Sequence, residues 1–258
     1  MATVAPQDSI DMGRVISRGI DALFKNAVPF LTVSLLLAGL PTLLMQWWML
    51  NSLGGIAGDP DTFASGGFWG MTAASLVVTT VSAALAQGII TRSTILYLGG
   101  RPIDIGQSVG AAFGLVLPIV GLSLLVTIIV GIGLVLLVVP GVILALMFCV
   151  AVPALVEERR GVFASLFRSK ELTSGSKPLI FVLMIFYVLF LWGVSFGFGM
   201  IAGAGALTTG NLVLAGAGEA VAATITSAVG ATMLSSLYIE LRTMKEGTTP
   251  DLMAEIFS

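Results

Sequence analysis

Two adjacent glutamates, Glu157 and Glu158, are the residues best placed for acid-base chemistry, because they stand beside Arg159 and Arg160. Neighbouring residues on a helix point in different directions, so the two carboxylates would not converge on one atom. We therefore predict that they pair with Arg159, Arg160 or Arg168. The chain contains no histidine, which excludes a Ser-His-Asp triad and a His-Glu-x-x-His zinc site. We expect no catalytic residue, no metal and no cofactor.

The same segment carries five basic residues that are candidates for binding lipid headgroups or a partner protein. They are Arg159, Arg160, Arg168, Lys170 and Lys177. Apolar residues interleaved with them, such as Phe163 and Phe167, predict a basic amphipathic helix on an anionic membrane surface. Each cation near such a surface contributes about 1 kcal/mol. The alternative is that these charges only set the topology of the chain, as basic cytoplasmic loops commonly do.

Gln87 and Glu219 are the candidates for a polar site inside the membrane. If the last span begins at residue 220, Glu219 lies at its outer end and stays hydrated, whereas a deeper position would suggest coupling to an ion or proton. Gln87 shares its span with other polar residues, and the last span has a stripe of small residues four apart. These are Ser75, Thr79 and Ser82, and Ala223, Ser227, Ala231 and Ser235. Helix packing is the favoured interpretation of both, and a polar pathway is the alternative.

Composition places these residues in a membrane protein. Hydrophobic residues make up 57% of the 258 residues and charged residues only 10%, where soluble domains have about 25% charged residues. Lys25 is followed by no charge until Asp59, and Lys177 by none until Glu219. Since about 20 helical residues cross a bilayer, such gaps are long enough for spans. The net charge of -2 gives no overall basic field that would suggest a nucleic-acid partner.

The apolar stretches predict an all-α integral membrane protein with six spans. The spans are about 27–49, 68–90, 109–131, 137–156, 178–202 and 220–239, and together they form a membrane domain over 27–239. Residues 1–26 are predicted to contain an amphipathic surface helix, and 240–258 to form a polar tail. The loops 50–67, 131–136 and 203–218 join spans on the side opposite the two ends of the chain.

The distribution of basic residues predicts the orientation. All twelve lysines and arginines fall before the first span, after the last span, or in the loops 91–108 and 157–177. The three remaining loops contain none. By the positive-inside rule, both termini and the short amphipathic helices lie in the cytoplasm.

Two segments resemble a known family. One runs from Pro140-Gly141 through Val152-Pro153-Ala154, Glu157-Glu158 and Arg168-Ser169 to Gly175, and the other from Tyr238 to Leu252. They look like the bacterial inner-membrane proteins grouped as the membrane domain of glycerophosphoryl diester phosphodiesterase, with related uncharacterised multi-pass families. The resemblance implies a six-helix membrane domain in a bacterial inner membrane. The catalytic domain of that family uses histidine, and it is absent here.

Together these features predict a non-enzymatic, multi-pass protein of the inner membrane that organises or binds lipids or partner proteins at its cytoplasmic face. The expected partners are membrane lipids, anionic ones in particular, another protein, or further copies of the chain. One alternative is a transporter or channel for an ion or small amphiphile, with helices broken near Pro140 and Pro153. The other is a membrane enzyme acting on lipid headgroups through Glu157 and Glu158.

Overall fold

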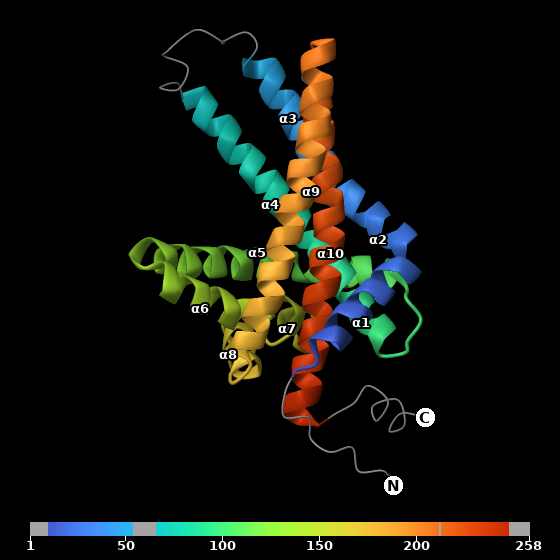
Figure 1. Ribbon diagram of the computed structural model, residues 1–258, viewed down its shortest axis with the longest axis vertical. Helices are drawn as coiled ribbons and strands as arrows, with labels where there is room; N and C mark the ends of the chain where they lie inside the picture. Colours follow the sequence, from blue (N-terminus) through green and yellow to red (C-terminus); the bar gives the residue numbers. More distant parts are fainter. Residues whose placement is uncertain (1–9, 54–65, 212, 248–258) are drawn as a thin grey trace.

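The computed structural model describes residues 10–53, 66–211 and 213–247, and this part of the chain is helical, without a strand. Figure 1 shows the order of the helices. They are α1 (Met12–Lys25), α2 (Ala27–Ser34), the π-helix η1 (Leu35–Gly39), α3 (Leu40–Leu53), α4 (Gly66–Leu98), α5 (Ile105–Leu136), α6 (Val138–Phe148), α7 (Ala151–Glu158), α8 (Val162–Thr173), α9 (Lys177–Thr209) and α10 (Val213–Glu246).

Six helical segments are long and apolar enough to cross a membrane. They are Ala27–Trp48, Trp69–Leu98, Ile105–Leu136, Val138–Glu158, Lys177–Thr209 and Val213–Glu246. The first consists of α2, η1 and most of α3, and the fourth consists of α6 and α7 with a break at Cys149 and Val150. These segments confirm the predicted all-α fold with six apolar helices, which is the architecture of a multi-pass membrane protein.

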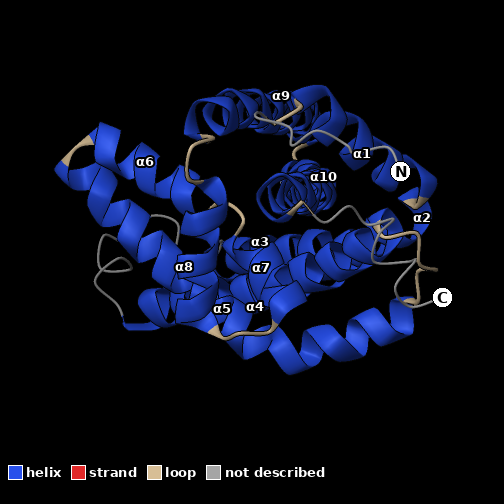
Figure 2. Ribbon diagram, turned by 90° about the horizontal axis from the view of Figure 1, so that it is seen from below, coloured by secondary structure: helices blue, strands red, loops and turns tan. Residues whose placement is uncertain are grey.

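Helix α10 is the central element. It packs against α9 along much of its length and also contacts α1, α3 and α4, and Figure 2 shows it enclosed by these neighbours. Small residues make this possible, since a Cβ at Gly218 would lie 2.7 Å from the carbonyl oxygen of Phe198 in α9. The backbones of α9 and α10 are thus in direct contact there, as small residues allow in membrane helices.

Gly218→Ala is therefore expected to lower the free energy of unfolding by about 1 to 3 kcal/mol, the usual cost of an added methyl group that has no space. Gly197→Ala is the matched control, because a Cβ at Gly197 in α9 meets nothing within 4 Å. Thermal unfolding of the two variants in one detergent measures the difference. Equal stability of both variants would contradict the direct backbone contact.

Helices α5 and α6 form a hairpin that lies across the long axis followed by α9 and α10 (Figure 1). A Cβ at Gly88 in α4 would face both Ala112 and Ile119 of α5. Helices α4 and α5 therefore pack closely at this point, where Figure 1 shows α5 lying across the direction of α4. The hairpin tip is apolar, and the side chains of residues 134–139 are exposed.

Two predicted loops are mostly helical. Within 131–136, α5 continues to Leu136 and only Leu137 is extended before α6 begins. Within 203–218, α9 continues to Thr209, and α10 starts at Val213 after Gly210, whose φ of 69° ends α9. The glycines and threonines of 203–218 predict a loop, but membrane helices accept these residues readily because the backbone there has no water to bond with.

The other boundaries also differ from the predicted ones. Helix α4 continues beyond residue 90 to Leu98, and α10 continues through the first part of the predicted tail to Glu246. The predicted loop 50–67 is helical at both ends, and its residues 54–65 lie outside the described part. Residues 1–9 and 248–258 lie outside it as well. Since α1 begins at Met12, the predicted N-terminal surface helix is present as a helix.

Candidate functional site

The ends of several helices come together at what we call the charged end of the molecule. It consists of α1, the C-terminal ends of α4 and α10, the helices α7 and α8, and the first residues of α9, and it is the lower part of Figure 1. All twelve lysines and arginines belong to these elements or to the residues that join them. Positive charge is therefore concentrated at one end of the molecule.

Glu240 of α10 holds α1 in place. Its carboxylate is almost fully buried, with 3% of the side chain exposed, and it accepts a hydrogen bond from Arg18 at 3.0 Å. Arg14 lies 3.6 Å away as a second cation. The Ser236 hydroxyl donates to the carbonyl oxygen of Val15 at 2.8 Å. Helix α1 is thus fixed to α10 by ion pairs and a backbone contact.

A second cluster of charges surrounds Arg168 of α8. Its Nε donates to Glu158 Oε1 at 2.7 Å, and its two other nitrogens contact Glu171 and Glu246. The Tyr238 hydroxyl also donates to Glu158, at 3.0 Å. Burial opposes the charged form of Arg168, but the hydrogen bonds that it donates to Glu158 and Glu246 outweigh burial and raise the pKa of the guanidinium. The predicted pairing of Glu158 with Arg160 or Arg168 is confirmed. For Glu157 the predicted partner is wrong, because Glu157 lies 3.8 Å from Arg242 of α10.

Arg168 therefore differs from the other basic candidates. Only 12% of its side chain is exposed, and its nitrogens are occupied by carboxylates of the protein. Arg159, Arg160 and Lys170 are exposed, and Lys177 is half-buried at the start of α9. Arg160 lies 3.2 Å from Glu158.

The exposed cations adjoin two exposed aromatic rings. Phe163 and Phe167 of α8 are 69% and 70% exposed, and with Lys170 they are spaced so that they share one side of the helix. The opposite side is buried, and the Ser169 hydroxyl there donates to the carbonyl oxygen of Met147 at 2.7 Å. Helix α8 thus presents apolar rings and positive charge on one side and is held on the other.

Glu219 lies within α10 and is exposed. It is the seventh residue of the helix, about 9 Å from its first residue. Gln87 lines a pocket, and Glu219 does not. The structure therefore does not bring together the two candidates for an intramembrane polar site.

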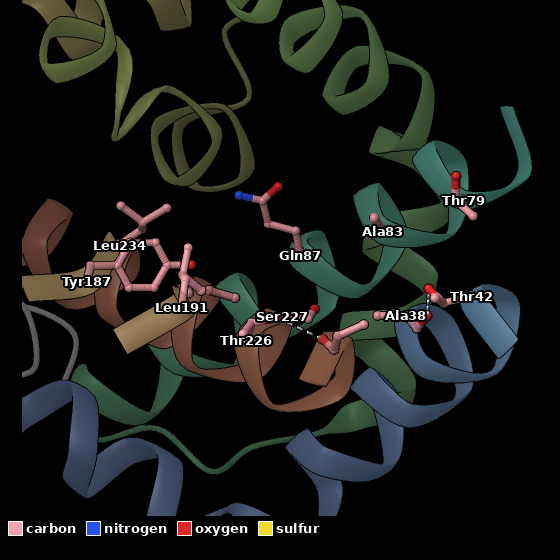
Figure 3. Close-up of a pocket in the computed structure, with 13 residues that line it drawn as sticks. Ala38, Thr42, Thr79, Ala83, Gln87, Tyr187, Leu191, Thr226, Ser227 and Leu234 are labelled. Atoms are coloured by element: carbon pink, nitrogen blue, oxygen red, sulfur yellow. Dashed lines mark hydrogen bonds between the residues drawn. The ribbon is translucent and has the colours of Figure 1, made fainter. Parts of the chain in front are cut away.

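Gln87 lines a pocket of about 410 Å³ between η1, α3, α4, α9 and α10, shown in Figure 3. The pocket is lined by Ala38, Thr42, Thr79, Ala83, Gln87, Tyr187, Leu191, Ala223, Thr226, Ser227, Gly230, Ala231 and Leu234. Six of these side chains are polar and none is charged. Ala223, Ser227 and Ala231 of the small-residue stripe therefore line this pocket. The sequence favours helix packing as the role of that stripe.

Three polar groups of the pocket have no hydrogen-bond partner within the described part of the chain. They are the Gln87 amide, the Tyr187 hydroxyl and the Ser227 hydroxyl. Thr42, Thr79 and Thr226 instead donate to carbonyl oxygens of their own helices. Sequence reasoning missed Tyr187 and Thr42, and the only signal for Tyr187 was a single hydroxyl in an otherwise apolar stretch.

Other chemistry receives no support from the described residues. Among them no group of three or more His, Cys, Asp or Glu side chains could hold a metal ion. The pentapeptide from Gly193 to Gly197 fits the Gly-x-Ser-x-Gly pattern, but it lies inside α9 and not at the strand-to-helix turn that a nucleophile requires. Comparisons of the chain with protein-family models, curated proteins and solved structures found no match.

Proposed function

We propose that this multi-pass membrane protein binds anionic lipids at its charged end and has no catalytic activity of its own. The observation that carries the proposal is the exposed side of α8, where Phe163 and Phe167 adjoin Lys170, with Arg159 and Arg160 in the preceding turn. Aromatic rings enter the boundary between headgroups and acyl chains, while cations attract anionic headgroups.

The fixed position of α8 supports this function. Its other side is packed on the protein, and Arg168 ties it to Glu158 and Glu246. The cations and rings are therefore presented without a large loss of conformational entropy on binding. The same ion pairs weaken the alternative of a membrane enzyme, because the carboxylate of Glu158 is already occupied by Arg168 and Tyr238.

We further propose that the charged end faces the cytoplasm of a bacterium and that the protein lies in the inner membrane. Twelve basic residues at one end are the pattern expected for a cytoplasmic face. The resemblance to the membrane domain of glycerophosphoryl diester phosphodiesterase agrees with this placement and remains a prediction. Binding of a partner protein or of further copies of the chain is the alternative use of the same face.

The test neutralises the three exposed cations together, as Arg159→Gln, Arg160→Gln and Lys170→Gln. At about 1 kcal/mol each, their loss should weaken binding of dioctanoyl phosphatidylglycerol by about a hundredfold. Native mass spectrometry of the detergent-purified protein, titrated with that lipid, measures the bound fraction.

The matched control neutralises three other cations of the charged end. These are Lys25, Arg101 and Lys245, which are exposed and lie outside α8. The control has the same net charge as the test variant and should bind the lipid nearly as well as the original chain. Equal losses in both variants, or no loss in either, would refute the proposal.

A further inference from the structure

We infer that the pocket around Gln87 binds an uncharged amphiphile that carries hydroxyl or carbonyl groups and enters from the bilayer. This site is distinct from the charged end, and the inference does not depend on the proposed function. It rests on the depth of the pocket, the chemistry of its lining and the side on which it opens.

The pocket lies within the membrane-spanning part of the molecule. Tyr187 is ten residues after Lys177, about 15 Å along α9, which is half of the roughly 30 Å hydrocarbon layer. Gln87 is five residues before Arg92 in α4, about 8 Å from that charge. Thr79 also lines the pocket and is 13 residues before Arg92, about 20 Å along α4. The pocket therefore extends to both sides of the middle of the membrane.

Polar groups at this depth need partners. An unpaired hydroxyl or amide in an apolar medium costs several kcal/mol, and the Gln87 amide, the Tyr187 hydroxyl and the Ser227 hydroxyl have none within the described chain. All three can both donate and accept hydrogen bonds. A ligand with hydroxyl and carbonyl groups would satisfy them.

The lining also excludes a charged ligand. No acidic or basic side chain reaches the pocket, so an ionised group would be buried without a counter-charge. The volume of about 410 Å³ lies in the range of about 300 to 1,000 Å³ that is usual for small-molecule sites. A glycerol ester head with its free hydroxyl has the required chemistry.

Entry from the bilayer follows from the arrangement of the helices. Helices α4 and α9 both pack on α10 but make few contacts with each other, so the pocket is a trough on α10 between them (Figure 3). Its apolar walls include Ala83, Leu191 and Leu234. A lipid can therefore place its polar head in the trough while its acyl chains remain in the surrounding hydrocarbon.

The experiment uses the full chain in lipid nanodiscs and a dioctanoylglycerol with a diazirine in one acyl chain. After photolysis, peptide mass spectrometry locates the label. We expect label on α4, α9 or α10 around the pocket, and competition by unlabelled dioctanoylglycerol. Dioctanoyl phosphatidic acid, which has the same chains with phosphate in place of the hydroxyl, should compete at least about tenfold less well, because its charge would be unpaired.

Two variants and a control connect the label to the polar lining. Gln87→Leu, and separately Tyr187→Phe, which removes a single oxygen atom, should each weaken competition about three- to tenfold, the effect of one hydrogen bond. Thr127→Val in α5 also removes one hydroxyl from an exposed position away from the pocket, and it should change nothing. Label elsewhere, equal competition by phosphatidic acid, or full binding by Tyr187→Phe would overturn the inference.

Discussion

Replacing Arg168 with methionine is expected to lower the free energy of unfolding by about 3 to 5 kcal/mol, the usual cost of removing one partner from a buried ion pair. The carboxylate of Glu158, with only 7% of the side chain exposed, would lose its closest cation. Arg160 and the Tyr238 hydroxyl would remain beside it. Methionine retains the apolar stem of the side chain, so the loss reports mainly on the charge.

Unfolding in a graded mixture of denaturing and mild detergents measures this loss. Glu171→Gln is the control, because it removes another partner of Arg168. The Glu171 side chain is 71% exposed, and surface pairs contribute about 0 to 1 kcal/mol. Combining Arg168→Met with Glu158→Gln should recover much of the stability, since no buried charge is then unpaired. An Arg168→Met variant as stable as the Glu171→Gln variant would refute this account of the cluster.

The ion pairs themselves were only partly predictable. Pairing of Glu158 with Arg168 follows from their closeness along the chain, ten residues apart. The bond between Arg18 and Glu240 joins residues 222 apart, and nothing in the composition of α10 indicates that Glu240 is buried. Only the packing of α1 on α10 brings that pair together, so it could not be deduced from local pattern.

The six apolar helices were predictable for a simple reason. A bilayer requires long uncharged segments, and such segments are visible in the sequence. The loops were less predictable, because the signals used for them come from soluble proteins. Residues 203–209, with their glycines and threonines, continue α9, since glycine is common in membrane helices and does not by itself end them.

The pocket around Gln87 was likewise only partly predictable from the sequence. The sequence indicates that Gln87 is a polar residue inside a span, but not whether it faces lipid, another helix or a pocket. The answer depends on where α9 meets α10, and that contact is set by Gly230, which leaves room for the Tyr187 hydroxyl and no room for a Cβ. Both Gln87 and Glu219 are polar residues of apolar helices, but of the two it is Gln87 that lines the pocket.

A cysteine at the tip of the α5–α6 hairpin is expected to resist a membrane-impermeant thiol reagent from either side of the membrane. The chain has one cysteine, so the experiment uses Leu137→Cys in a Cys149→Ala background. Helix α5 packs on α4 at Gly88. Gly88 is four residues before Arg92, so the hairpin begins about 6 Å along α4 from that charge. The exposed apolar residues 134–139 would then lie within one leaflet.

The control that decides between the two arrangements is Asn211→Cys, in the turn between α9 and α10 at the end opposite the charges. If the hairpin crossed the whole membrane, its tip would reach the same surface as Asn211, and both cysteines would react with the reagent on that side. If it lies across the axis, Asn211→Cys reacts while Leu137→Cys does not, until detergent is added. This comparison holds whichever surface is cytoplasmic, because it asks only whether two positions share a side. Equal reaction of both cysteines in intact membranes would show a hairpin that spans the bilayer.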